Sequence, residues 1–130
     1  MNLITNLISI LIFSILIFTN RVLPSKAISD VDWILLKENQ DGKEWLDLGS
    51  LKRIKNDEIS VLTKFFENPK KENEKGKTSL YVMNINCKSN QYKDTSINGF
   101  PTLNSKWQDS DNDELIEVVI EKSCKEGGFN

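Results

Sequence analysis

The sequence predicts an α+β fold: a single antiparallel β-sheet of about five or six strands, with a carboxy-terminal α-helix packed on one face and tied to it by a disulfide. Apolar and polar side chains alternate with period two over 59–65 and again over 78–87, as in half-buried strands. Residues 110–124 repeat their apolar side chains with helical periodicity instead. The two cysteines, Cys87 and Cys124, end the second strand-like run and the helix, so a bond between them would strap the helix onto the sheet.

The amino terminus has the features of an export signal. Its central hydrophobic segment, Leu7–Phe18, is 12 residues long, which suits a signal peptide better than a membrane span of about 20 residues. Small residues at Ser25 and Ala27 predict cleavage after Ala27, with 1–27 as the signal peptide and 28–130 as the domain. No Lys or Arg precedes the apolar run, so an uncleaved membrane anchor is the alternative. Either way, we expect the domain to lie outside the cytoplasm, in the periplasm, at the cell surface or secreted.

The first predicted elements form a hairpin. Apolar residues 31–36 and 44–48 flank a polar turn that contains Asp41-Gly42, a pair that favours hairpins. We expect Gly49-Ser50 to break the returning strand. The next strand, 59–65, is the clearest in the chain because its alternation is unbroken.

The second half of the sheet should have one buried face and one wet face. In the run 78–87, one face carries Tyr81, Met83, Ile85 and Cys87, and the other carries Asn84 and Asn86. This division is typical of an antiparallel sheet. A weaker strand is expected at 91–95, and 97–108 is expected to be irregular.

The closing helix shows start and stop signals. Asp111 with Glu114 three residues later fits a capping box, and Gly127-Gly128 fit a stop. The apolar face comprises Leu115, Ile116, Val118, Val119 and Ile120.

Composition excludes several classes of function. A formal charge of −2 argues against nucleic-acid binding, and the chain has no histidine, which excludes triads built on that residue. Two cysteines in an exported chain favour a structural disulfide over a reactive thiol or a redox pair. The acidic residues Asp109, Asp111, Asp113 and Glu114 resemble the start of a calcium loop, but Glu114 and Ile120 occupy the positions that require Gly and Glu. Helix capping therefore explains them better than a weak surface calcium site. We therefore predict a protein without catalytic residues, metal or cofactor.

Three tryptophans and one charged loop are candidate binding elements. Trp33, Trp45 and Trp107 adjoin apolar neighbours, so we expect them to pack; a stacking platform for a sugar or an aromatic ligand is the alternative. The mixed-charge loop 70–77 is expected to be a solvated hairpin tip rather than a contact loop for an acidic partner.

Several short pieces occur in an order that resembles the surface-adhesin protein E-like family. They are Trp33; Trp45-Leu46-Asp47 followed by Ser50-Leu51 and the Lys52-Arg53 turn; Asn86-Cys87 followed by Tyr92-Lys93; Trp107; and Cys124. The resemblance covers most of residues 31–124. It implies a curved antiparallel sheet with the carboxy-terminal helix disulfide-bonded to it, and it implies an envelope or surface protein.

Three functions follow as hypotheses. The first is an exported, non-enzymatic, adhesin-like domain that binds an unknown macromolecule of the envelope or the extracellular space through the open face or edge of its sheet. The second is a structural or assembly factor of the envelope, held at the membrane by an uncleaved amino-terminal helix. The third is a carboxylate enzyme or a small-ligand carrier, which requires a pocket with a perturbed acid.

Overall fold

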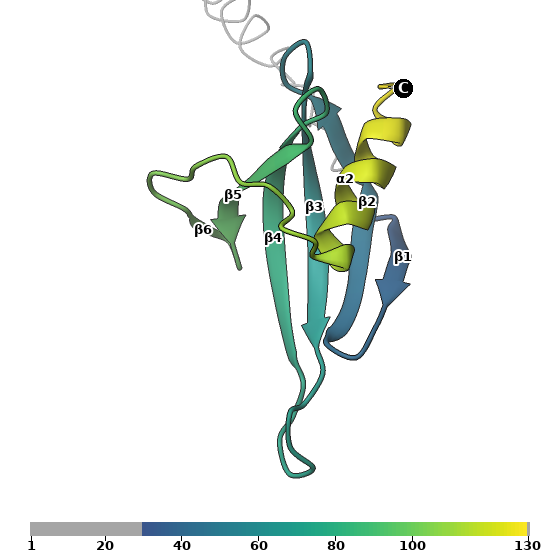
Figure 1. Cartoon of the computed structure of the whole chain (residues 1–130), viewed down its shortest axis with the longest axis vertical. Helices are drawn as coiled ribbons and strands as arrows, with labels where there is room; N and C mark the ends of the chain where they lie inside the picture. Colours follow the sequence, from purple (N-terminus) through teal and green to yellow (C-terminus); the bar gives the residue numbers. More distant parts are fainter. Residues whose placement is uncertain (1–29, 130) are drawn as a thin grey trace, which may run out of the picture.

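The computed structural model describes residues 30–129 and shows one sheet with one helix (Figure 1). The predicted signal segment 1–27 lies outside the described residues. The strands are β1 (Trp33–Glu38), β2 (Gly42–Arg53), β3 (Glu58–Glu67), β4 (Lys77–Asn86), β5 (Gln91–Ile97) and β6 (Phe100–Pro101), and the helix is α2 (Glu114–Glu126). Within this part of the chain, no helix is long and apolar enough to span a bilayer.

The six strands form a meander, in which each strand pairs antiparallel with its neighbour in the sequence. The α+β class, the single antiparallel sheet and the carboxy-terminal helix are therefore confirmed. Figure 1 shows α2 lying along one face of the sheet, beginning about midway along the strands. We call the face under α2 the inner face and the opposite one the outer face.

The core lies between α2 and the inner face. Alternate residues of the central strands supply it, as the period-two pattern predicted. Its buried members are Leu46, Ile59, Val61, Met83, Ile85, Val119 and Ile120. Of the predicted apolar face of the helix, Leu115, Val119 and Ile120 are buried and Ile116 is partly buried against this cluster, whereas Val118 does not belong to it.

The strand β2 passes through the predicted break at Gly49-Ser50 and continues to Arg53. The pairing between β2 and β3 shifts between Asp47 and Lys52, which marks a bulge rather than an end. Side chains satisfy the backbone there. Asp47 Oδ1 accepts from the backbone N–H groups of Asp32 and Gly49, and Ser50 Oγ accepts from that of Leu62.

The helix begins at Glu114 and is capped by Asp113, so the predicted start at Ser110 with Asp111 as the cap was wrong. Asp111 and Asn112 have φ values of 50° and 65°, in the left-handed region, whereas an N-cap residue needs an extended backbone. Asp113 has that conformation, and its Oδ1 accepts from the N–H groups of Leu115 and Ile116. The predicted stop is confirmed, because the helix ends before Gly127 and Gly128.

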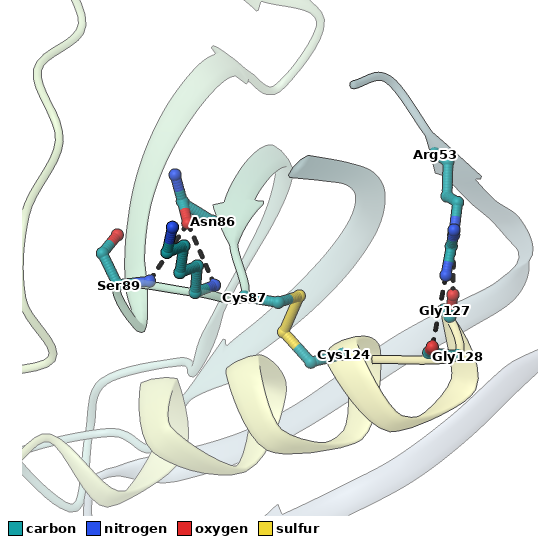
Figure 2. The surroundings of a disulfide bond; sticks show 8 residues. Arg53, Asn86, Cys87, Ser89, Cys124, Gly127 and Gly128 are labelled. Atoms are coloured by element: carbon teal, nitrogen blue, oxygen red, sulfur yellow. Dashed lines mark hydrogen bonds between the residues drawn. A yellow bond between two sulfur atoms is a disulfide. The ribbon is translucent and has the colours of Figure 1, made fainter. Parts of the chain in front are cut away.

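Cys87 and Cys124 are joined, as predicted, with their Cα atoms 5.6 Å apart (Figure 2). The bond links the end of β4 to the last turns of α2. On the other side of the helix end, Arg53 donates to the carbonyl oxygens of Gly127 and Gly128. The carboxy-terminal half of α2 is thus held to the sheet from two sides.

We expect the double variant Cys87→Ser/Cys124→Ser to lose about 3–4 kcal/mol of unfolding free energy, since a 37-residue separation gives that loop-closure entropy. Urea unfolding of the oxidised protein and of the variant measures the difference. A loss below about 1 kcal/mol would contradict the idea that this bond is a main support of the small domain.

Candidate functional site

The outer face carries a lysine held between two tryptophans. Trp45 of β2 is directly opposite Lys64 of β3, and Trp33 of β1 lies diagonally beside them. The Lys64 Nζ is 4.6 Å from the centroid of the Trp33 ring and 4.5 Å from that of Trp45. These distances are within the range of cation–π attraction.

Trp45 and Lys64 belong to a row of cross-strand neighbours that runs across the outer face from β1 to β4. Leu35 pairs with Trp45, and Leu80 pairs with Lys64, so four strands contribute one residue each to a straight line across the outer face. Leu35 is 52% exposed and Leu80 is 39% exposed, which shows that this line is open to solvent. The helix of the described chain packs on the other face.

The third tryptophan pairs with another outer-face lysine. Trp107 lies just before a bridge that joins Gln108 to Tyr92, and its ring centroid is 4.4 Å from the Nζ of Lys93. Within residues 30–129, neither Lys64 nor Lys93 forms an ion pair with a carboxylate. The three tryptophans are half-buried and lie outside the core cluster.

The two asparagines of the predicted wet face have different roles. Asn84 lies on the outer face, opposite Lys93. Asn86 Oδ1 accepts from the backbone N–H groups of Lys88 and Ser89, so this side chain caps the turn after β4 (Figure 2).

An apolar arm extends from the edge of the sheet. Figure 1 shows β6 and the loop after it projecting away from the body of the domain. Phe100 is 77% exposed and Leu103 is 86% exposed. Asn98 and Gly99 connect β5 to β6 with φ values of 50° and 83°, as a two-residue hairpin turn requires. The prediction that 97–108 is irregular is therefore wrong for this hairpin, and the Asn-Gly pair is the sequence signal that could have indicated it.

A cavity of about 300 Å³ lies between the start of α2 and the inner face. Its acidic groups are Asp41, Glu44, Asp94 and Asp113, and its other walls are Thr63, Phe65, Tyr81, Met83, Tyr92, Leu115 and Ile116. No Lys or Arg belongs to this lining. We call it the acidic cavity.

Glu44 is the most buried acid of the cavity, with 4% of its surface exposed. Burial, which disfavours the charged form, raises the pKa of its carboxyl to about 8. A hydrogen bond with Thr63 lowers this pKa, and the nearby charges of Asp113 and Asp94 raise it. Glu44 therefore exchanges its proton close to neutral pH.

The neighbours of Glu44 are shifted in the same sense. Burial raises the pKa of the Asp94 carboxyl. Burial also raises the pKa of Tyr92, and the charges of Asp94, Asp113 and Asp111 add to that shift. The charges of Asp94 and Asp113 thus oppose the ionisation of both Glu44 and Tyr92.

The acids that the sequence singled out serve other purposes. Asp113 caps α2, and Asp109 Oδ1 accepts from Gln91. Within residues 30–129, no group of three or more His, Cys, Asp or Glu side chains has an arrangement that could hold a metal ion.

The family model described as Surface adhesin-E matches residues 34–130. The chain belongs to the Surface adhesin-E family. The match extends from β1 through the helix and includes both cysteines, so the resemblance inferred from short motifs is confirmed. No curated protein and no solved structure matches the chain.

For this Surface adhesin-E protein, we expect stability to fall as the pH rises from about 4.5 to about 8. The folded state holds the Glu44 proton more tightly than the unfolded chain does. This stabilisation of the folded state is therefore complete below the pKa of Glu44 in the unfolded chain, and it is lost as the pH rises through the pKa in the folded state. One such group changes the unfolding free energy by up to about 1.4 kcal/mol per pH unit. Urea unfolding across this window, compared with Glu44→Gln, isolates the effect. Parallel pH profiles for the two proteins would contradict it.

Proposed function

We propose that this Surface adhesin-E protein is an exported, non-enzymatic binding module that attaches to a macromolecule of the envelope or the extracellular space through the outer face of its sheet. Membership of an adhesin family supports the general role. The buried apolar face and the helix support it indirectly, because they use the inner face for folding and leave the outer face to a partner.

The disulfide supports an extracytoplasmic location. Bonds of this kind persist in oxidising compartments, whereas the cytosol keeps thiols reduced. The bond between Cys87 and Cys124 links the end of β4 to α2, which is the only helix packed on the sheet in the described chain. The predicted signal segment 1–27 agrees with this location.

The observation that carries the proposal is Lys64 between Trp33 and Trp45. The two rings restrict the lysine side chain before a partner arrives, which lowers the entropy cost of binding. Tryptophans are also enriched among the residues that dominate binding energy at interfaces. A partner that offers carboxylate groups beside apolar surface would match this row, with Leu35 and Leu80 as its apolar ends.

We expect the purified, oxidised protein to be retained saturably on immobilised envelope fractions or extracellular-matrix proteins. Lys64→Gln should weaken this binding about tenfold, the equivalent of about 1.4 kcal/mol, because it removes the charge and the cation–π contacts together. Surface plasmon resonance measures both affinities.

The matched control is Lys125→Gln, which removes one exposed lysine from the helix side. It should bind as the wild type does. Equal losses in the two variants would show that net charge, not the outer face, governs attachment, and no retention of the wild type would remove the proposal.

We also expect the protein recovered from the expressing bacterium to begin at Ile28, since Ser25 and Ala27 occupy the small-residue positions of a cleavage site. Intact-mass spectrometry of the native protein decides this. A mass that includes residues 1–27 would favour the membrane-anchored structural or assembly factor.

A further inference from the structure

We propose that the acidic cavity is a binding site for an alkylammonium group, that is, a primary amine carried on a short apolar stem. The proposal concerns the inner face at the start of α2. It does not depend on the outer face or on the function proposed for it.

The shape of the site limits the size of the ligand. Sites for small molecules range over about 300–1,000 Å³, and this cavity is about 300 Å³. It therefore suits a chain of a few carbon atoms rather than a bulky molecule. The start of α2 forms one wall of the site, because Asp113, Leu115 and Ile116 line it. In the described chain, the helix covers the end of the sheet that bears the disulfide (Figure 1).

Three of the acids that line the cavity have carboxyl oxygens that are not fully used by hydrogen bonds within the described chain. Asp113 uses Oδ1 for both N–H groups of the helix cap, which leaves Oδ2 available. Among residues 30–129, Thr63 is the only residue whose side chain hydrogen-bonds the buried Glu44 carboxyl, and no side chain or backbone group hydrogen-bonds the Asp94 carboxyl. A carboxyl group offers about four acceptor positions, so these groups retain acceptors for the N–H donors of an ammonium that enters the cavity.

The walls of the cavity suit the stem of such a ligand. Phe65, Tyr81 and Tyr92 supply aromatic rings, and Met83 and Leu115 supply aliphatic and thioether surface. Aromatic faces attract organic cations and pack against methylene groups. Within residues 30–129, no three of these acids, or of any His, Cys, Asp or Glu side chains, are arranged to hold a metal ion. The combination favours an organic cation over a metal ion.

Electrostatics link binding to pH. Glu44 of β2 faces Thr63 of β3, Asp94 of β5 and Asp113 before α2, and Tyr92 lies near the same two aspartates. A bound ammonium stabilises the ionised acids, whereas an alkylamine itself stays protonated up to about pH 10. The affinity should therefore rise between about pH 6 and about pH 8, and binding in that range should release a proton from Glu44.

Titration calorimetry of the full, oxidised protein tests the proposal with n-pentylamine hydrochloride and with pentan-1-ol, which has the same stem without the charge. We expect the amine to bind at least tenfold more tightly than the alcohol. Titrations in buffers of different ionisation enthalpy should detect the released proton. Equal affinities, or no binding of the amine at millimolar concentration, would overturn the proposal.

Blocked glycyl-lysyl-glycine distinguishes two sources of the same group. Binding of this peptide with an affinity similar to that of pentylamine supports a lysine side chain of a protein partner as the natural ligand. Binding of pentylamine without the peptide supports a free small amine, because the peptide backbone then does not fit the mouth of the cavity.

Variants connect the binding to the named residues. Glu44→Gln and Asp94→Asn should each weaken pentylamine at least tenfold, and the first should also abolish the release of the proton. Glu72→Gln makes the same chemical change in the exposed loop between β3 and β4 and should bind as the wild type does. Thermal unfolding monitors whether each variant folds.

Two outcomes of these variants separate the present proposal from others. Unchanged amine affinity in both folded cavity variants would overturn it. Loss of amine binding in Lys64→Gln would equally contradict it, since that residue belongs to the outer face. Failure of the adhesin-like function would leave the amine titrations unaffected.

Discussion

The contact of one helix with one sheet face, closed by the bond between Cys87 and Cys124, is the constraint on which the rest of this domain depends. The sheet is a simple meander, and a sheet with one uncovered apolar face is not stable in water. The helix covers that face with Leu115, Val119 and Ile120. The disulfide and the Arg53 bonds to Gly127 and Gly128 then decide which end of the face is covered, because both act at the carboxy-terminal end of α2.

This one-sided attachment explains the acidic cavity. The helix begins about midway along the strands, so among residues 30–129 no second layer covers the inner face beyond the first turn of α2 (Figure 1). The strands there point polar and aromatic side chains inward, with Glu44, Thr63 and Tyr81 in place of the aliphatic residues found beneath the helix. A buried carboxyl without a cationic partner is costly, and the protein limits this cost by keeping Glu44 protonated up to about pH 8.

Each face of the sheet combines aromatic rings with ionisable groups, basic on the outer face and acidic on the inner face. On the outer face, Lys64 lies between Trp33 and Trp45. On the inner face, Glu44 and Asp94 share a cavity with tyrosine rings. Strand alternation makes such a division straightforward, since neighbouring residues such as Glu44 and Trp45 point to opposite faces. The registers of β1 with β2 and of β2 with β3 position the Lys64 site, whereas the relation of Glu44 to Asp94 depends on the pairings from β2 through β5.

The sequence alone determined the class of the fold, the faces of β3 and β4, the partners in the disulfide and the family. These properties follow from period-two and helical repeats, from a pair of cysteines and from the order of short motifs, all of which are local in the chain. It did not determine the cap at Asp113, the bulge in β2 or the hairpin at Asn98-Gly99, because backbone conformation and side-chain bonds settle these. Only the tertiary structure decided the acidic cavity and the Lys64 site. Glu44 and Asp94, like Trp33 and Lys64, come from strands that are not neighbours in the sheet, and no local pattern records the distance between them.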